Sequence, residues 1–410
     1  PRFLPLIAGQ ALASWALAYL ARESYAVHLV RLGILANLAI LGIFKYFNFF
    51  SDTIASLTGA ELDRISVVLP IGISFYTFQI VSYLADLRRG RAPLYSMRRF
   101  LLYILLFPQL IAGPIVRHNE IMGQFDGNPH GPGAAEAFAR GAVLFVIGLA
   151  KKVLLADPLA AMADPVFQTA TTAAPAFGAA WLGLAAFTLQ IFLDFSAYSE
   201  MAIGLGRMMG LRFPDNFDQP YRSLSVREFW RRWHMTLSRF LRDYLYVPLG
   251  GSREGTRRYL VATFTTMGLC GLWHGAGWTY VVWGLYHGAG LVVCRGWEAR
   301  GRTLPKLVAW GLTLVFVMFG WVLFRAADFS AVVTMLTGLA GLGSAAVAVE
   351  GATLLVPAAL VSLVGVSPQA MVERWLKPHP VFAVSTAAVF VYCVLVVGKG
   401  QPVSFIYFQF

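Results

Sequence analysis

Residues 229–251, FWRRWHMTLSRFLRDYLYVPLGG, decide how the rest of the chain is organised. This segment is rich in arginine and aromatic residues and is too charged to cross a bilayer. Twenty residues further on, residues 271–278, GLWHGAGW, place His274 in one of the most apolar parts of the chain. Burying an ionisable residue at membrane depth is costly, and such residues commonly mark functional sites. Together the two segments indicate chemistry carried out within a membrane.

The composition is that of a membrane protein with several spans. Of the 410 residues, 58% are hydrophobic and only 13% are charged, whereas soluble domains carry about 25% charged residues. The mean hydropathy is +0.63. The net charge is +12, and because the basic residues flank apolar runs, we attribute it to topology and lipid headgroups rather than to nucleic acid. The three cysteines lie in or next to apolar segments, which argues against a disulfide framework.

Long apolar runs predict an all-α fold of transmembrane helices, each needing about 20 apolar residues. Loops rich in arginine stay in the cytoplasm. Residues 86–99 hold five arginines and residues 207–258 hold eleven, so both segments are predicted to be cytoplasmic, which places the acidic residues 51–64 outside. We predict spans at residues 3–21, 29–50, 65–85, 139–156, 177–203, 307–325, 352–367 and 381–397, and a two-span hairpin at residues 259–297.

Residues 100–116, FLLYILLFPQLIAGPIV, do not fit a simple crossing. The run is short and is interrupted by prolines and a glycine, and a crossing here would put the eleven arginines of residues 207–258 outside. We therefore predict a re-entrant element, which must pack within protein or line a cavity.

We expect a single membrane domain over residues 1–410 that contains a cytoplasmic interfacial platform at residues 207–258. Because the chain starts at a proline inside an apolar run, we also expect further spans before it.

Three histidines are candidates for chemistry: His274, His234 and His287. Burial favours the neutral imidazole, which suits a general base. The alternative is a histidine that packs between helices and bonds to a neighbouring carbonyl, and this alternative weighs more for His287 than for His274. We expect the remaining histidines to be exposed at loops or interfaces: His28, His118, His130 and His379.

Cys270 lies four residues before His274, so the two side chains would be neighbours on a continuous helix. The pair is a conceivable thiol nucleophile with its base, or half of a zinc site. No basic residue near Cys270 lowers the pKa of the thiol, and no H-x-x-x-H or C-x-x-C pair supplies further ligands. We therefore disfavour both readings and predict no metal site.

The platform carries the residues that we expect to bind substrate. Arginine forks match the oxygens of a phosphate-bearing donor, although an interfacial helix with snorkelling arginines and an aromatic belt explains the same composition. Both interpretations stay open. Asp194 ends an apolar run, where it can pair with a platform arginine or orient a catalytic imidazole. The predicted substrate-binding residues are Arg231, Arg232, Trp233, Arg242, Asp243, Tyr244, Asp194, Trp273 and Trp278.

With these residues in view, the chain resembles the membrane-bound O-acyltransferase (MBOAT) family, and in particular the bacterial branch typified by the alginate O-acetyltransferase membrane subunit. The resemblance covers nearly the whole chain, with Phe240 where tryptophan is expected and Thr236 where serine is common. Besides the two segments above, it rests on LPIGISFYTFQIVSYLAD (residues 69–86), FPQLIAGPIVR (107–117), DFSAYSEMAIGLGRMMG (194–210) and FIYFQF (405–410).

The resemblance implies a ring of tilted helices around a central funnel or tunnel in the bacterial cytoplasmic membrane. It implies that His274 is the catalytic histidine and His234 the second signature histidine. An acyl group from a cytoplasmic thioester donor, acetyl-CoA or an acyl carrier, would pass across to hydroxyls of an extracytoplasmic polysaccharide such as alginate. An extracytoplasmic acetyltransferase partner of the SGNH type is also implied. Whether His274 only removes a proton or briefly carries the acyl group stays open.

Two rival functions remain at this point. One is a transporter or channel without enzymatic activity, in which the glycine and proline breaks would form a discontinuous-helix site; we see no internal repeat to support it. The other is the same chemistry on a different acceptor, such as peptidoglycan, cellulose, another exopolysaccharide, or teichoic acid that receives D-alanine.

Overall fold

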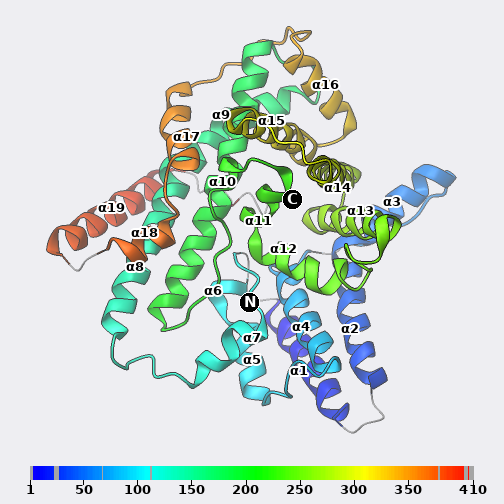
Figure 1. Cartoon of the computed structure of the whole chain (residues 1–410), viewed down its shortest axis with the longest axis vertical. Coiled ribbons are helices and arrows are strands. Elements are labelled where there is room, and N and C mark those ends of the chain that lie inside the picture. The colour runs from blue at the N-terminus through cyan, green and yellow to red at the C-terminus, as the bar shows by residue number, and fades with distance from the viewer. Residues whose placement is uncertain are drawn as a thin grey trace. The chain divides into compact units, whose positions relative to one another are not determined.

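The computed structural model describes residues 3–22, 27–66, 68–110, 113–376, 379–400 and 405. Within these ranges the regular structure is helical, apart from one isolated β-bridge between Pro175 and Ala345. The predicted all-α class is therefore confirmed (Figure 1). The chain divides into two compact units, Pro1–Phe138 with Gly206–Pro214, and Ala139–Leu205 with Asp215–Phe410.

The first unit is built mainly from its N-terminal helices. Helix α2, the π-helical turn η1 and α3 run on as one helical segment of 32 residues, Val27–Thr58. The elements are α1 (Leu4–Leu20), α2 (Val27–Leu41), η1 (Gly42–Tyr46), α3 (Phe47–Thr58), α4 (Ile73–Arg88), α5 (Met97–Leu105), α6 (Phe107–Leu110), α7 (His118–Ile121) and η2 (Met122–Asp126).

The second unit contains most of α8 and α10 and all the later helices. Helix α13 packs against α14, and α14 packs against α15 (Figure 1). The elements are α8 (Ala134–Lys151), η3 (Lys152–Ala156), α9 (Asp157–Thr169), α10 (Phe177–Met208), η4 (Pro220–Arg222), α11 (Val226–Arg232), α12 (Met235–Leu241), η5 (Arg242–Tyr246), α13 (Gly255–His274), α14 (Trp278–Ala299), α15 (Lys306–Arg325), α16 (Phe329–Leu339), η6 (Ala352–Leu354), α17 (Leu355–Leu363), α18 (Pro368–Arg374) and α19 (Pro380–Lys399).

Fewer helices reach span length than the sequence predicts. Among the described residues, four are long and apolar enough to cross a membrane: Val27–Thr58, α10, α15 and α19. They contain the predicted spans 29–50, 177–203, 307–325 and 381–397. The other predicted spans fold as helices that are shorter, broken or less apolar; α1, for example, has 17 residues.

Two predicted spans are interrupted at proline and glycine. The described residues 65, 66 and 68–72 are not helical, and α4 begins only at Ile73, because Gly72 adopts a left-handed φ of +76°. The predicted span 352–367 is broken in a similar way: α17 ends at Leu363, and α18 starts at Pro368 after a bend of 58°. Ser367 caps this new helix by accepting a hydrogen bond from the Ala370 N–H. With α17 and α18 taken as one bent span, five membrane crossings are possible.

Residues 100–116 and the platform are each built from several short helical pieces. Helices α5 and α6, with 9 and 4 residues, are each too short to span a bilayer, and re-entry of this segment stays a prediction. The platform is not one continuous helix, since residues 226–246 form α11, α12 and the π-helical turn η5. The break between α11 and α12 falls at His234, whose φ of +41° is left-handed. Such a conformation is costly for a residue other than glycine and often occurs at functional sites.

The expectation that His118 is exposed is wrong. Its side chain is buried in the first unit, with Nε2 3.2 Å from Asp86 Oδ2 and Nδ1 3.2 Å from Tyr95 Oη. These two polar partners satisfy both ring nitrogens, so burial of the imidazole leaves no nitrogen without a hydrogen bond. His28, His130 and His379 are exposed as predicted.

Candidate active site

Helices α13 and α14 form the predicted hairpin, and His274 is the last helical residue before its turn. Glycines bring the two backbones into contact. A Cβ on Gly271 would lie 2.0 Å from the Tyr280 carbonyl oxygen, and one on Gly284 would lie 2.0 Å from the Met267 carbonyl oxygen. Any larger residue at either position would force the helices apart. The two glycines therefore allow the close packing of α13 against α14 that positions His274.

His274 is buried in a cage of aromatic rings, with an exposed fraction of 6%. Its ring centroid lies 5.0 Å from Trp273, 5.2 Å from Trp283 and 5.3 Å from Phe324 of α15. The second signature histidine, His234, lies beside it with a centroid separation of 6.4 Å. The structure therefore brings together the two histidines that the sequence singled out, although 40 residues separate them.

His234 is completely buried at the break between α11 and α12. Its Nδ1 lies 3.0 Å from Asn216 Oδ1, and its Nε2 has no hydrogen-bond partner among the described residues. Burial disfavours the charged imidazolium and lowers the pKa of His234 to about 3. The side chain is therefore neutral at physiological pH.

The surroundings of Asn216 fix which nitrogen of His234 carries the proton. The backbone N–H and the hydroxyl of Thr236 both point at one atom of the Asn216 amide, at 3.4 and 2.8 Å. An N–H can only donate, so this atom is Oδ1, and the amide nitrogen Nδ2 is left to donate to Ser199 Oγ at 3.0 Å. His234 must then donate from Nδ1, and its Nε2 carries the lone pair of a base.

His287 has the opposite tautomer. The Trp230 indole can only donate, and it does so to His287 Nδ1 at 3.2 Å, so the proton of the neutral ring sits on Nε2. Neither this N–H nor the indole N–H of Trp283 has a partner among the described residues. Both nitrogens face Gly320 of α15, where a Cβ would lie 2.9 Å from His287 Nε2 and 3.6 Å from Trp283 Nε1. Two buried donors thus lie beside the same glycine, where α14 and α15 pack too closely for a larger residue.

A cavity of about 790 Å³ is formed by the platform helices and the hairpin. Its lining includes the apolar side chains of Trp230, Leu241 and Met267, which suit an uncharged arm. Arg242 pairs with its neighbour Asp243 at 2.8 Å, and Arg227 pairs with Glu298. Four arginines in all line the cavity: Arg227, Arg231, Arg242 and Arg295. This combination of cationic and apolar surface fits a phosphate-bearing molecule with a long uncharged arm.

The remaining predicted platform residues have other surroundings. Arg232 is held by Glu228 at 3.0 Å and by Asp218 at 3.2 Å. Trp233 is buried, with its ring 4.9 Å from Trp321, and so belongs to the aromatic core. Tyr244 packs on Phe240 at 4.9 Å. Trp273 lies within the histidine cluster, 6.0 Å from His234, whereas Trp278 is 48% exposed at the start of α14.

Asp194 has a lysine partner that the sequence did not indicate. Lys152 Nζ lies 2.8 Å from Asp194 Oδ1 and 2.7 Å from Asp157 Oδ1, and Lys152 and Asp194 are both buried. Lys152 opens the π-helical turn η3, a local widening of the helix that is frequent at functional sites. The predicted alternatives, a platform arginine or a catalytic imidazole, both overlooked this neighbouring helix.

Sequence reasoning missed Asn216, Trp283 and the cavity arginines Arg227 and Arg295. Asn216 lies in a loop 18 residues before His234 and belongs to no recognisable spacing. Trp283 is one of several tryptophans in apolar runs, and only the fold selects it. Arg295 did carry a signal, since it ends an apolar run, and Arg227 shortly precedes the aromatic pair Phe229–Trp230. No group of three His, Cys, Asp or Glu residues arranged to hold a metal occurs in the described part of the chain.

Comparisons with known proteins agree with this arrangement. The model of the MBOAT, membrane-bound O-acyltransferase family, matches residues 20–329. A probable alginate O-acetylase of Pseudomonas aeruginosa is 47% identical over 302 residues, which are 72% of this chain and 57% of the relative. A peptidoglycan O-acetyltransferase of Helicobacter pylori is 37% identical over 377 residues, 83% of this chain and 71% of the relative.

A teichoic acid D-alanyltransferase of Bacillus subtilis is 29% identical over 282 residues, 63% of this chain and 69% of that protein. The chain spans only 57 to 61% of the length of the first alginate relatives that it matches. The family match nevertheless covers most of the chain, and it includes both histidine segments and the hairpin. The chain is a multi-pass membrane protein and belongs to the membrane-bound O-acyltransferase family.

Proposed function

We propose that this protein transfers an acyl group, most simply acetyl, from a cytoplasmic thioester to a hydroxyl acceptor. The observation that carries the proposal is the pair of buried histidines, His234 and His274, 6.4 Å apart and drawn from separate signature segments. One of the two, His234, is neutral and has a lone pair at Nε2. Neutral imidazoles in a site closed to water are suited to accept a proton from a hydroxyl.

In the proposed reaction, His274 removes the proton of the acceptor hydroxyl as its oxygen attacks the thioester carbonyl carbon. The carbonyl π electrons move onto oxygen, and N–H groups stabilise the resulting negative charge. The C–S bond then breaks, the thiolate takes the proton back from His274, and the ester leaves. We propose His287 Nε2–H and Trp283 Nε1–H as the oxyanion donors, because both are buried, lack partners among the described residues and lie beside Gly320.

The arginine-lined cavity is proposed to bind the donor, either acetyl-CoA or an acyl carrier. Phosphates would lie against Arg231, Arg242 and their neighbours, with the uncharged arm along Trp230 and Met267. The predicted ring of tilted helices around a funnel supplies the route to an acceptor on the opposite side of the bacterial cytoplasmic membrane. The names of the relatives favour an extracytoplasmic polysaccharide, either alginate or peptidoglycan. An SGNH-type acetyltransferase partner would complete the transfer.

The proposal is tested with the purified full chain in sealed vesicles that carry labelled acetyl-CoA on one side. Transfer of label to alginate or peptidoglycan fragments on the other side is the expected result, and the acceptor that takes label identifies the substrate. Label that stays on the donor in the presence of either acceptor and of an SGNH-type partner would contradict the proposed activity. Uptake of intact acetyl-CoA, with no ester formed, would instead favour a transporter.

Donor binding depends on the shape of the arginine side chains as well as on their charge. Arg231→Lys or Arg242→Lys keeps the charge and removes the planar fork, so we expect the donor concentration for half-maximal transfer to rise about tenfold with a smaller change in maximal rate. Arg257→Lys is the matched control, because Arg257 is exposed and does not line the cavity. Unchanged donor dependence in both cavity variants would leave these arginines only a role at the membrane surface.

Asn216→Asp is expected to make acyl transfer sensitive to pH. In the natural protein His234 has a pKa of about 3, so it stays neutral from about pH 5 to about pH 9 and contributes no inflection. A carboxylate at position 216 still accepts from Nδ1–H but favours the imidazolium, which raises the pKa of His234. The rate of the variant should fall as pH drops, and be about tenfold below that of the natural protein near pH 6.

The control for Asn216→Asp is Asn128→Asp, which adds the same charge in an exposed loop. Rates of acyl transfer are measured across the pH range for the natural protein and both variants. If the two variants have the same pH profile, the tautomer of His234 has no part in the reaction.

A further inference from the structure

A second cavity, of about 600 Å³, lies in the second unit and shares no lining residue with the arginine-lined one. Helices α8, α10, α17, α18 and α19 contribute to it, and most of its lining is apolar, for example Ile147, Leu154 and Val389. Its volume lies within the range of about 300–1,000 Å³ that is usual for small-molecule sites. None of the histidines discussed above lines it, although Phe217 of its lining stacks on His234 with ring centroids 6.3 Å apart.

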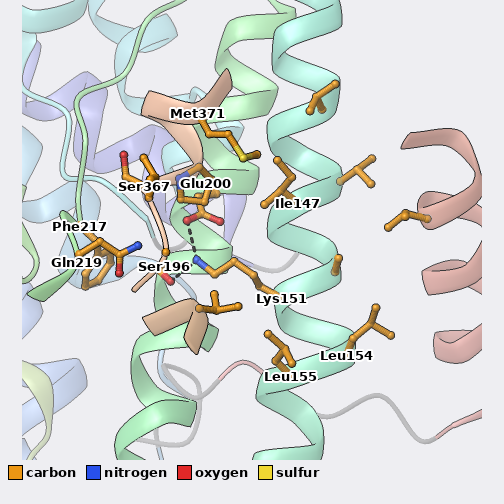
Figure 2. A pocket seen from close by; sticks show the side chains of 18 of the residues that line it. Ile147, Lys151, Leu154, Leu155, Ser196, Glu200, Phe217, Gln219, Ser367 and Met371 are labelled. Atoms are coloured by element: carbon orange, nitrogen blue, oxygen red, sulfur yellow. Dashed lines mark hydrogen bonds and ion pairs between the residues drawn. The ribbon is translucent and has the colours of Figure 1, made fainter. Parts of the chain in front are cut away.

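A buried ion pair forms one wall of this cavity. Lys151 Nζ donates to Glu200 Oε1 and to Ser196 Oγ, both at 2.7 Å (Figure 2). Lys151 and Glu200 are 7% and 8% exposed. Because the two charges cancel, the wall offers no net attraction to a phosphate or carboxylate.

Two polar groups on this wall remain unsatisfied. Glu200 Oε2 is buried and has no hydrogen-bond partner among the described residues, and the same holds for Gln219 Oε1. Gln219 is 7% exposed and is held in a left-handed conformation with a φ of +45°. Figure 2 shows its amide on the same side of the cavity as Ser196 and Glu200. Leaving such groups unpaired is unfavourable, so a ligand that pairs them gains affinity.

The chemistry of these two groups limits the ligand. An ionised carboxylate can only accept, so a partner of Glu200 Oε2 must donate. A side-chain amide accepts at oxygen and donates at nitrogen, and therefore pairs with a group that does both. A hydroxyl can donate to either group and can also accept from the amide. An ester without hydroxyls has no donor and therefore pairs with neither of the two unsatisfied oxygens.

The outer wall of the cavity indicates where the ligand comes from. Helix α19 is one of the four span-length helices, and only 6% of its apolar window is buried. Its residues Ser385, Thr386 and Val389 line the cavity. A helix of this kind faces the hydrocarbon of the bilayer, so an apolar chain can enter past it from the membrane.

We propose that this cavity binds a neutral amphipathic lipid whose hydroxylated headgroup bonds to Glu200 and Gln219. The acyl chain lies among the apolar side chains of α8 and α19. The site is distinct from the arginine-lined cavity, and its occupation does not depend on the acyl-transfer chemistry proposed above.

The test is direct binding of radiolabelled 1-monooleoylglycerol to the purified full chain in phosphatidylcholine nanodiscs. Methyl oleate, which has the same chain and no hydroxyl, and oleate, which carries a charge, should each compete at least about tenfold more weakly. Gln219→Leu removes one hydrogen-bonding group at similar volume and should weaken monooleoylglycerol binding about tenfold. Melting temperatures establish that each variant is folded.

A matched pair on α19 tests the position of the site. Val389→Trp fills the cavity and should abolish binding, whereas Val391→Trp changes a neighbouring exposed residue outside the lining and should not. Equal competition by methyl oleate and monooleoylglycerol would overturn the proposal, because the cavity would then select only for apolar surface. Equal binding by the two tryptophan variants would overturn it as well.

Discussion

Replacing His274 with alanine is expected to lower acyl transfer by roughly 10²–10⁴-fold, the usual effect of losing a general base. The imidazole is buried in an aromatic cage, and its ring neighbours include Trp273, Trp283, Phe324 and the neutral His234. Transfer is measured as label moved from the thioester donor to the acceptor, at equal amounts of protein inserted in the membrane.

A second variant separates chemistry from packing. His274→Phe keeps a ring in the cage and removes both nitrogens, so it should be as inactive as the alanine variant while disturbing the hairpin less. His130→Ala serves as a control, because His130 is exposed in a loop. His234→Ala should reduce transfer less completely if His234 lines the donor passage. A well-folded His274→Phe protein with a near-native rate would leave His274 a packing residue.

The parts of the fold that the sequence predicts are those in which one local signal dominates. Uninterrupted apolar runs predict α15, α19 and the middle of α10, because helix formation and membrane burial require the same residues. The turn after His274 is predicted correctly because three glycines occur within seven residues. Where proline or glycine falls inside an apolar run, as before α4 and α18, the apolar pattern predicts a span and the backbone breaks it.

The candidate site could be predicted only in part, because its polar contacts come from distant segments. Basic and aromatic residues next to a buried histidine point to His234 and His274. The residues that orient them give no local signal: Asn216 becomes significant only because Thr236 and Ser199 fix its amide. The burial of His118 and the pairing of Lys152 with Asp194 also depend on partners between 32 and 42 residues away. Such pairs cannot be recognised from the spacing of residues along the chain.

Gly320→Ala is expected to lower acyl transfer about 10²-fold, although it adds only a methyl group. The new Cβ would lie 2.9 Å from His287 Nε2 and 3.6 Å from Trp283 Nε1, so it would crowd both N–H donors. If these donors stabilise the oxyanion, the methyl group excludes the oxygen from them. The measurement is the maximal rate of transfer, since donor binding in the arginine-lined cavity should change little.

Helix α15 supplies its own control, because Gly311 lies on the same helix and a Cβ there would meet nothing within 4 Å. Gly311→Ala should therefore keep full activity, and alanine in a helix is favoured over glycine by about 1 kcal/mol. If Gly320→Ala instead destabilises the protein, Trp283→Phe removes one N–H while keeping an aromatic ring, and its rate of transfer tests the same assignment. Activity near that of the natural protein in folded Trp283→Phe and Gly320→Ala would mean that the oxyanion is stabilised elsewhere, and that Gly320 serves only the packing of α14 against α15.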